Sequence, residues 1–458
     1  MTMRIAFVSE HASPVALLGG ADAGGQNVYV DEVSRNLGRL GYKVDVFTRR
    51  DNADAPTVIE WAPNVRVVNL AAGPPRVLPK DRLWPYMPLF RDLLLEFMAR
   101  DGVSYDLLHG NFWMSGAVVA ELRAYLGIPA VQIFHAMGKT KRRHQGDADT
   151  SAPERVTVEE RVIRAVDRVI AQCPAEVSEL VDDYGAPCDK VVVIPSAVNT
   201  EVYRPVPRDR ARQRIGLAPD SPVVVYVGRM LPRKDVRNVV RAFALLLRRY
   251  EEECGPRRTA CTSAARSRPD TTGVSSQTPL RAYSDTPLLL LVGGETVEPD
   301  PVATPEIGEL QRLAAELGVA DRVRFVGKRQ PDVLRDYYSA GDIAVTTPWY
   351  EPFGLTPLEA MACGVPVVGS AVGGITYTIA DGETGLLVPP RDPERLAGAL
   401  YHLLAAPDAR RRMGAAARAR TERLFTWPVV AERTAALYDE LSAARRQPSA
   451  EGAIVGAR

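Results

Sequence analysis

The sequence lacks the features of secreted, membrane-spanning and zinc-binding proteins. Its five cysteines form no C-x-x-C pair and are odd in number, which argues against a disulfide framework or a zinc site. No run of eighteen apolar residues occurs, so no segment is predicted to span a bilayer. Residues 1–10 lack the basic flank and long apolar core of a signal peptide. We therefore expect a cytoplasmic protein.

An excess of charge of one sign is also missing. The formal net charge is +1 with 25% charged residues, so nothing global indicates a nucleic acid or membrane-surface partner. With 458 residues, of which 46% are apolar, the chain is long enough for two domains with cores of their own.

The most informative stretch runs from Trp349 to Gly374. An apolar strand at 343–346 leads into a loop and then a helix whose apolar positions recur at helical spacing and which Gly364 ends. Glu351 stands in the loop and Glu359 about one turn inside the helix. Both carboxylates are expected at the carboxyl end of the sheet, where open α/β folds bind ligands.

The start of that helix suits an anionic group. The N–H groups of Phe353, Gly354 and Leu355 have no partner within the helix. Carboxylates can bind the hydroxyl groups of a sugar, and backbone amides can bind a phosphate. The two together fit a nucleotide sugar. Two solvated glutamates on a surface helix are the plainer alternative.

The N-terminal half begins as a strand–loop–helix–strand unit. A strand at 4–9, a glycine-rich loop at 11–25, a helix at about 26–40 and a strand at 43–48 predict parallel strands. The loop ends in Gly24 and Gly25, which let the backbone approach a phosphate. The G-x-G-x-x-G fingerprint of dinucleotide folds is absent.

Further strands and helices alternate along this half, which predicts one doubly wound domain. Strands are expected at 65–70, 107–109, 130–134, 169–171 and 191–194, and helices at 89–100, 116–126 and 175–184. Polar or aromatic residues follow two of these strands, Phe112 after one and His135 after another. A loop at 136–151 crowds Lys139 and other cations together and could receive an acidic acceptor or form a solvated surface run. Asp147 and Asp149 lie in a polar loop, where we expect no metal.

The C-terminal half restarts the pattern after a proline-rich, charged linker at 205–220. Arg229 and Lys234 flank the turn between a strand at 223–227 and a helix from about 236, and two cations near a helix start can neutralise a diphosphate. Residues 251–285 are rich in Arg, Ser, Thr, Pro and Gly and are interpreted as a disordered insertion.

The stretch E-P-F-G-L-T-P-L-E-A-M-A-C-G, with seven residues between its two glutamates, resembles the signature of retaining glycosyltransferases of family 4. The resemblance covers nearly the whole chain. It is closest to the branch with sucrose-phosphate synthase and the inositol-phosphate glycosyltransferase of mycothiol synthesis, through D-A-G-G-Q-N-V-Y-V, H-G-N-F-W-M-S-G and R-K-D-V-R-N-V-V-R-A-F.

The resemblance implies an α/β fold of the GT-B type, with two Rossmann-like doubly wound domains facing a central cleft. The implied organisation is an acceptor-binding domain at 1–204, a linker at 205–220, a nucleotide-sugar-binding domain at 221–425, a helix at 426–445 crossing back to the first domain, and a tail at 446–458.

The resemblance also implies a chemistry. A hexose moves from a UDP- or GDP-sugar to a small polar acceptor, phosphorylated or not, with retention and without a metal or other cofactor. A homodimer is one assembly we expect. The implied catalytic residues are His135, Arg229, Lys234 and Glu351. The implied donor-binding residues are Gly24, Gly25, Arg229, Lys234, Arg329, Glu351, Phe353, Gly354, Leu355 and Glu359. The implied acceptor-binding residues are Asn27, Lys80, Phe112, Lys139 and Arg155.

The acceptor positions depart from the family pattern. Lys80 and Arg155 match a lysine and an arginine that meet the acceptor phosphate in the inositol-phosphate enzyme, but Phe112 and Ala136 stand where that enzyme has a tyrosine and a threonine. Neither side chain offers a hydroxyl to a phosphate. Two other functions stay open: a GT-B nucleotide-sugar epimerase and a non-catalytic sugar-binding protein.

Overall fold

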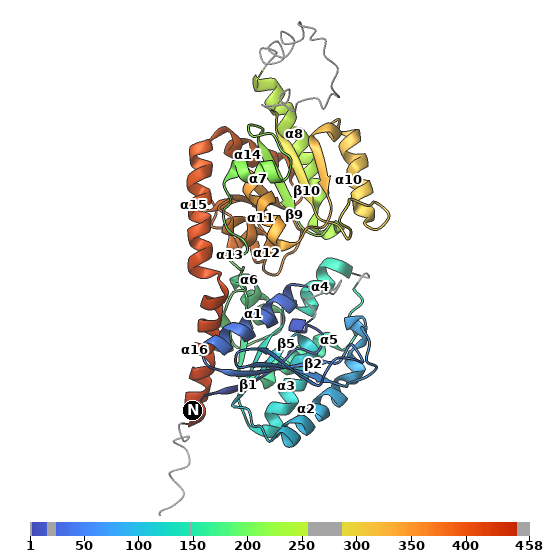
Figure 1. The fold of residues 1–458 in the computed structure, drawn as a ribbon, viewed down its shortest axis with the longest axis vertical. Helices are drawn as coiled ribbons and strands as arrows, with labels where there is room; N and C mark the ends of the chain where they lie inside the picture. Colours follow the sequence, from blue (N-terminus) through green and yellow to red (C-terminus); the bar gives the residue numbers. More distant parts are fainter. Residues whose placement is uncertain (1, 16–23, 147–148, 255–285, 447–458) are drawn as a thin grey trace, which may run out of the picture. The chain divides into compact units, whose positions relative to one another are not determined.

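The computed structural model describes residues 2–15, 24–146, 149–254 and 286–446. The chain divides into two compact units, one formed by Met1–Ala197 with Leu424–Arg458 and the other by Val198–Arg423 (Figure 1). Each unit is built on a parallel sheet flanked by helices. The predicted α/β class with two doubly wound sheets is therefore confirmed. Among the described helices, none combines the length and the apolar character needed to cross a bilayer.

The sheet of the first unit has the strand order β3-β4-β2-β1-β5-β6-β7-β8. Its neighbouring strands are parallel except at the edge, where β3 runs antiparallel to β4. Strand β3 was not among the predicted strands. The strands are β1 (Arg4–Val8), β2 (Lys43–Arg49), β3 (Val58–Ala62), β4 (Val65–Leu70), β5 (Leu107–Asn111), β6 (Ala130–Ile133), β7 (Arg168–Ala171) and β8 (Val191–Val193).

Helices cover both faces of this sheet. They are α1 (Gly25–Arg39), α2 (Met87–Asp101), α3 (Trp113–Leu126), α4 (Gly138–Gln145), α5 (Arg155–Ala165), α6 (Pro174–Ser178) and α16 (Trp427–Arg446). Successive residues of β1 point to opposite faces of the sheet, and each face packs in a hydrophobic core of its own. Ile5 and Phe7 pack with α1 and α16, whereas Ala6 and Val8 pack with α2 and α3. The chain end therefore completes one of the two cores of the first unit.

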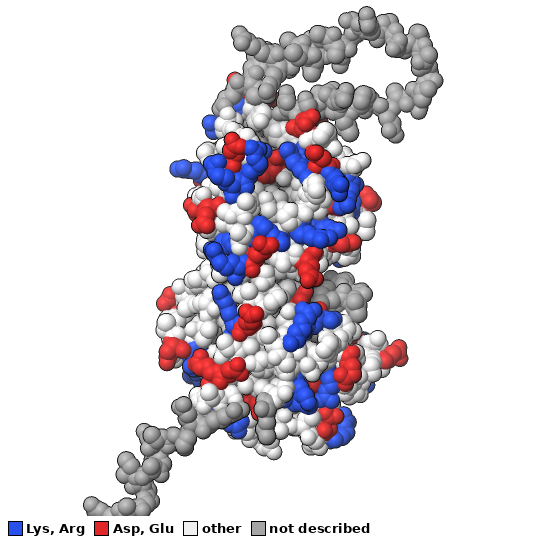
Figure 2. All heavy atoms as spheres, turned by 60° about the vertical axis from the view of Figure 1, so that its left-hand side comes forward, with Lys and Arg blue, Asp and Glu red and all other residues white. Residues whose placement is uncertain are grey.

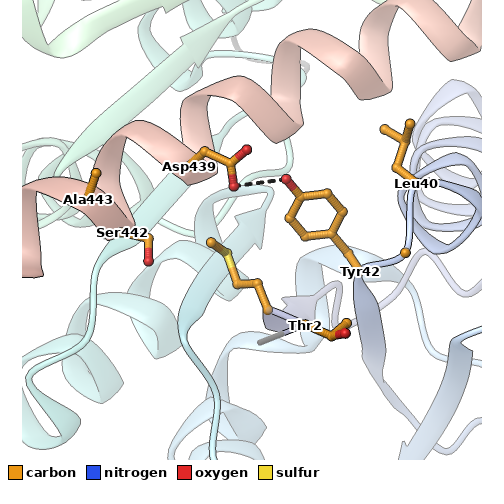
Figure 3. A pocket seen from close by; sticks show the side chains of 8 residues that line it. Thr2, Leu40, Tyr42, Asp439, Ser442 and Ala443 are labelled. Carbon is orange, nitrogen blue, oxygen red and sulfur yellow. Dashed lines mark hydrogen bonds between the residues drawn. The ribbon is translucent and has the colours of Figure 1, made fainter.

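Helix α16 is fixed by contacts along its length. Trp427 and Tyr438 are buried in the same core as β1, and the Tyr438 hydroxyl lies 2.5 Å from His109 Nδ1 on β5. Near the C-terminal end of α16, Tyr42 donates a 2.9 Å hydrogen bond to Asp439 at the edge of a cavity (Figure 3). This cavity lies beside Thr2, at the amino end of β1, whereas parallel sheets bind ligands at the carboxyl ends of their strands.

The sheet of the second unit has the order β11-β10-β9-β12-β13-β14 and is parallel throughout. Its strands are β9 (Val223–Val227), β10 (Leu288–Val292), β11 (Val323–Val326), β12 (Ile343–Thr346), β13 (Val367–Ser370) and β14 (Gly385–Val388). Its helices are α7 (Arg208–Arg214), α8 (Val236–Cys254), α10 (Pro305–Glu316), α11 (Pro331–Ala340), α12 (Leu355–Ala362), α13 (Ile375–Thr378), α14 (Pro393–Ala405) and α15 (Pro407–Leu424). Because β9 lies beside β12, the loops that follow these two strands meet.

The stretch at 205–220, predicted to be a linker, lies within the second unit, and the boundary between the units falls at Ala197/Val198. Residues 208–214 form α7, and the Arg212 side chain is 1% exposed. Arg212 donates to the carbonyl oxygens of Ala340 and Ser221, which ties α7 to the sheet. The charge and proline content of this stretch indicated a linker. The burial of Arg212 could not be predicted from the sequence alone. Of the predicted insertion at 251–285, residues 251–254 continue α8, and 255–285 lie outside the described residues.

The surface charges of the described residues are mixed on the face that Figure 2 draws. Blue Lys and Arg side chains alternate with red Asp and Glu over both units (Figure 2). Interspersed signs of this kind create no extended field of a single sign on that face.

Glu176 on α6 gives the first unit a pH-dependent stability. Its side chain is buried, its Oε2 accepts a 2.7 Å hydrogen bond from the Gln172 amide, and burial raises its pKa from 4.5 to about 8. The folded state therefore favours the protonated acid. The contribution of this carboxyl to the free energy of unfolding is fully present below pH 4.5 and is lost as the pH rises to about 8. Glu176→Gln should stabilise the protein at pH 8 by on the order of 3 kcal/mol and much less at pH 5.

Urea unfolding at the two pH values measures this difference. Glu121→Gln, which changes a side chain that is 46% exposed, is the matched control and should have a small effect at both values. An equal gain for Glu176→Gln at pH 5 and pH 8 would contradict the assignment.

Candidate active site

The loops after β9 and β12 bring together a lysine and a glutamate that are far apart in sequence. Lys234 forms an ion pair with Glu351, and their side chains are 13% and 16% exposed. Two further hydrogen bonds join the loops: Trp349 N–H to the Arg233 carbonyl at 3.0 Å, and the Thr347 hydroxyl to the Asp235 carbonyl at 3.0 Å. The pair is therefore held on a rigid base at the carboxyl ends of two adjacent strands.

Helix α12 begins directly after this pair. It starts at Leu355, and the preceding Gly354 has φ 91°, a left-handed conformation that favours glycine. The turn is supported from behind by Gly374, whose N–H donates to the Glu351 carbonyl at 3.0 Å. A Cβ on Gly374 would lie 2.3 Å from Phe353 Cα, so only glycine fits this backbone contact. An ammonium, a carboxylate and the amides of a helix start thus lie within one loop system.

Glu359 lies one turn inside α12 and is largely withdrawn from water. Its Oε2 accepts a 2.7 Å hydrogen bond from the hydroxyl of Tyr338 on α11. Burial raises the pKa of Glu359 to about 7, while hydrogen bonds from Tyr338 and Tyr203 and the charge of Lys234 oppose that rise. The carboxyl group is therefore partly ionised near neutral pH.

The other two cations predicted for this half follow β9 and β11 and have different partners. Arg229 follows β9, is 70% exposed along its side chain, and lies 3.9 Å from Glu295. Arg329 follows β11 and donates to the carbonyl oxygens of Val297 and Lys328. Arg229 is available to a ligand at the end of β9, whereas Arg329 joins the loops that follow β10 and β11.

In the first unit, polar and aromatic residues gather where β1, β5 and β6 end. His135 Nε2 lies 3.2 Å from Asn111 Oδ1, and the ring of His11 packs edge-on to Phe112 at 5.0 Å between centroids. Burial, followed by the charge of His11, lowers the pKa of His135 to about 3. His135 is therefore a neutral imidazole at physiological pH.

Phe112 and His135 both have left-handed backbones, with φ 76° and 60°. Non-glycine residues in this conformation cost free energy and occur preferentially at functional sites. The Phe112 ring lies 5.1 Å from the Arg155 guanidinium carbon and 5.8 Å from Lys80 Nζ. Two cations thus lie over one buried aromatic ring at this edge of the sheet.

Known proteins resemble this chain over most of its length. Residues 23–202 match the profile described as Glycosyltransferase Family 4, and residues 280–420 match Glycosyl transferases group 1. D-inositol 3-phosphate glycosyltransferase of Acidothermus cellulolyticus is 37% identical over 97% of this chain and 91% of its own length, and the Corynebacterium efficiens protein of that name is 35% identical over 96% of both. The chain belongs to glycosyltransferase family 4.

Solved structures agree with this glycosyltransferase in fold. Sucrose-phosphate synthase of Thermosynechococcus elongatus superposes with a TM-score of 0.77 and 34% identity over 96% of this chain and all of the other. Anabaena HepE, solved with UDP and glucose, gives 0.66 at 20% identity over 96% of this chain and all of its own. The predicted GT-B class is thereby confirmed, and the chain is a glycosyltransferase.

Three predicted acceptor residues of this glycosyltransferase already have partners within the protein. Arg155, 1% exposed, pairs with Glu159 at 2.8 Å and donates to the Ala136 carbonyl at 2.5 Å. Lys139 pairs with Glu160 at 2.8 Å. Asn27 stabilises the start of α1, where its Oδ1 accepts from the Gly24 amide. A ligand would have to share these donors, so their placement as acceptor residues stays a prediction.

The loop predicted at 136–151 was wrong over part of its length, because residues 138–145 form α4. Lysine and arginine are good helix formers, and Gly146 ends the helix with φ 52°. Lys141 pairs with Asp149 and Arg143 with Asp183, so the basic cluster is partly neutralised. Asp147 lies outside the described residues. Within the described residues, no three His, Cys, Asp or Glu side chains are grouped so as to hold a metal.

Sequence reasoning missed several residues of these clusters. Glu10 is buried, and its Oε1 lies 2.7 Å from His11 Nδ1 at the end of β1. Their position directly after an apolar strand was the signal that could have found them. Tyr203 and Tyr338, which contact Glu359, carry no motif, and only the packing of the second unit identifies them.

Proposed function

We propose that this glycosyltransferase moves a hexose from a nucleoside diphosphate sugar to a small polar acceptor, with retention at the anomeric carbon and without a metal. The observation that carries the proposal is the Lys234–Glu351 pair beside the start of α12. An ammonium and helix-start amides suit a diphosphate, and a carboxylate suits sugar hydroxyls. The match to family 4 over both units supports the same chemistry.

In the proposed reaction, the bond between the anomeric carbon and the diphosphate oxygen breaks, and its electron pair leaves with the diphosphate. Lys234, Arg229 and the amides at the start of α12 stabilise that charge, which is electrostatic preorganisation. The acceptor hydroxyl bonds to the anomeric carbon on the same face and gives its proton to the departing phosphate. Glu351 holds sugar hydroxyls, and Glu359 holds the ribose.

His135, a residue of the first unit, suits a role as a neutral hydrogen-bond partner of the hexose. With a pKa of about 3 it neither donates a proton as an acid nor adds positive charge at neutral pH. We propose that it orients a sugar hydroxyl.

For the acceptor, we propose a small polyol. D-inositol 3-phosphate is the first compound to test, because relatives named D-inositol 3-phosphate glycosyltransferase are 35–37% identical. Phe112 and Ala136 lack the hydroxyl groups that would bond a phosphate. The test panel therefore also contains unphosphorylated cyclitols and other sugar phosphates.

A thermal-shift screen of UDP, GDP and their sugars identifies the donor, since a ligand that binds only the folded state raises the Tm. Donor and acceptor are then incubated together. We expect nucleoside diphosphate release that requires the acceptor, and a product with the donor's anomeric configuration by NMR. Isomerisation of the donor without transfer would indicate an epimerase instead, and binding without turnover would indicate a sugar-binding protein.

A further inference from the structure

Two buried tyrosines surround Glu359. Tyr338 is 1% exposed and donates to Oε2 of Glu359 at 2.7 Å, and Tyr203, 8% exposed, is a polar neighbour of the same carboxyl that favours its ionised form. The two rings pack against each other with centroids 6.2 Å apart at 68°. The carboxylate is therefore approached from α11 and from the segment that opens the second unit.

That opening segment is itself fixed to the helix carrying Glu359. Arg418 on α15 donates to the Tyr203 carbonyl at 3.0 Å and to the Ala362 carbonyl, at the end of α12, at 2.5 Å. The Val206 amide donates to the Ser339 hydroxyl on α11 at 3.1 Å. The Tyr203 side chain thus has little freedom to leave Glu359, because its backbone is tied to both neighbouring helices.

We propose that Tyr203 and Tyr338 are positioning residues that fix the Glu359 carboxylate for the hydroxyl groups of the donor ribose. The inference rests on the proposed function, which places the ribose at Glu359. An ionised carboxylate can accept about four hydrogen bonds. Tyr338 fills one of these positions, Tyr203 packs against Tyr338 beside the carboxyl and restrains its rotation, and the remaining positions are left for a ribose diol.

Removing a tyrosine hydroxyl has two physical consequences. It frees the carboxylate to turn away from the ribose, which weakens discrimination between ribose and deoxyribose. It also takes away a hydrogen bond that favours the ionised carboxylate, so the pKa of Glu359 rises further above its present value of about 7. Lys234 also acts electrostatically on Glu359, and Arg335 and Arg418 act on Cys363, whose pKa the Glu359 charge raises. None of these neighbouring groups is changed in the variants below.

The test measures the Kd of UDP and GDP and of their 2′-deoxy forms by calorimetry, in Tyr203→Phe, Tyr338→Phe and the double variant. The wild type should prefer the ribonucleotide about tenfold or more, since one hydrogen bond to a charged group is lost in the deoxy form. Each variant should lose most of this preference, and the pH below which affinity falls should move upward. Tyr337→Phe, which removes a hydroxyl from the neighbouring residue of α11, is the control and should change neither value.

Glu359→Gln separates the inference from the proposed function. If it abolishes the ribose preference while both tyrosine variants keep it, the inference is overturned and the donor site stands. If Glu359→Gln itself keeps the preference, the ribose does not lie at Glu359, and both fail. Because the two tyrosines are tested singly, poor folding of one variant leaves the other to decide.

Discussion

Replacing Lys234 by alanine should lower kcat for hexose transfer by about 10²–10³-fold, which is the usual effect of removing one preorganised group that stabilises developing negative charge. The ammonium is 13% exposed and is held by Glu351, so it is oriented before a donor arrives. Charge on the leaving diphosphate is larger in the transition state than in the bound donor. Loss of Lys234 should therefore lower kcat more than it raises KM for the donor.

Steady-state kinetics with the donor found in the screen measures this loss, with the Tm recorded in parallel to show that the variant is folded. Arg237→Ala is the matched control, because Arg237 is a cation in the first turn of α8 that pairs with Glu306 away from Glu351. It should retain nearly full activity. Lys234→Arg, which keeps the charge but not the geometry, should fall between the two. An unchanged kcat in Lys234→Ala would show that the leaving diphosphate does not lie at Lys234.

The local parts of this site could be predicted from the sequence. The apolar runs, the glycines that end them and the seven-residue spacing of Glu351 and Glu359 each depend on a short stretch of chain. The structure accordingly places Gly354 directly before α12 and Glu359 within it. Arg229 and Lys234 likewise follow β9, as the pattern of strand, turn and helix indicated.

The partners of these residues could not be predicted, because they come from distant parts of the chain. Lys234 meets Glu351 only because β9 lies beside β12, and strand order is a property of the whole sheet. Arg155 was predicted to bind the acceptor, and the structure buries it against Glu159. The same limit applied to Arg212, which lies in the predicted linker but is buried against Asp342 in the second unit.

The largest expected effect on stability is at Asp342, at the start of β12. Its carboxylate is 4% exposed and lies 2.9 Å from Arg208, 3.0 Å from Arg212 and 3.1 Å from Arg410. It also accepts from the Val223 amide at 2.8 Å. One anion thus joins α7, β9 and α15, and it balances three guanidinium groups, of which Arg212 is buried so deeply that desolvation lowers its pKa to about 10.

Asp342→Asn should cost about 3–5 kcal/mol, because removing one partner of a buried ion pair leaves uncompensated buried charge. For a unit of this size that corresponds to a drop in Tm of roughly 10 °C. Calorimetry should show the change in the transition that a bound nucleoside diphosphate shifts, since the proposed donor site and Asp342 belong to the same unit. Asp408→Asn makes the same substitution in an ion pair with Arg411 in which both side chains are more than 70% exposed, and it should cost under about 1 kcal/mol. Equal Tm values for the two variants would show that the three arginines do not depend on Asp342.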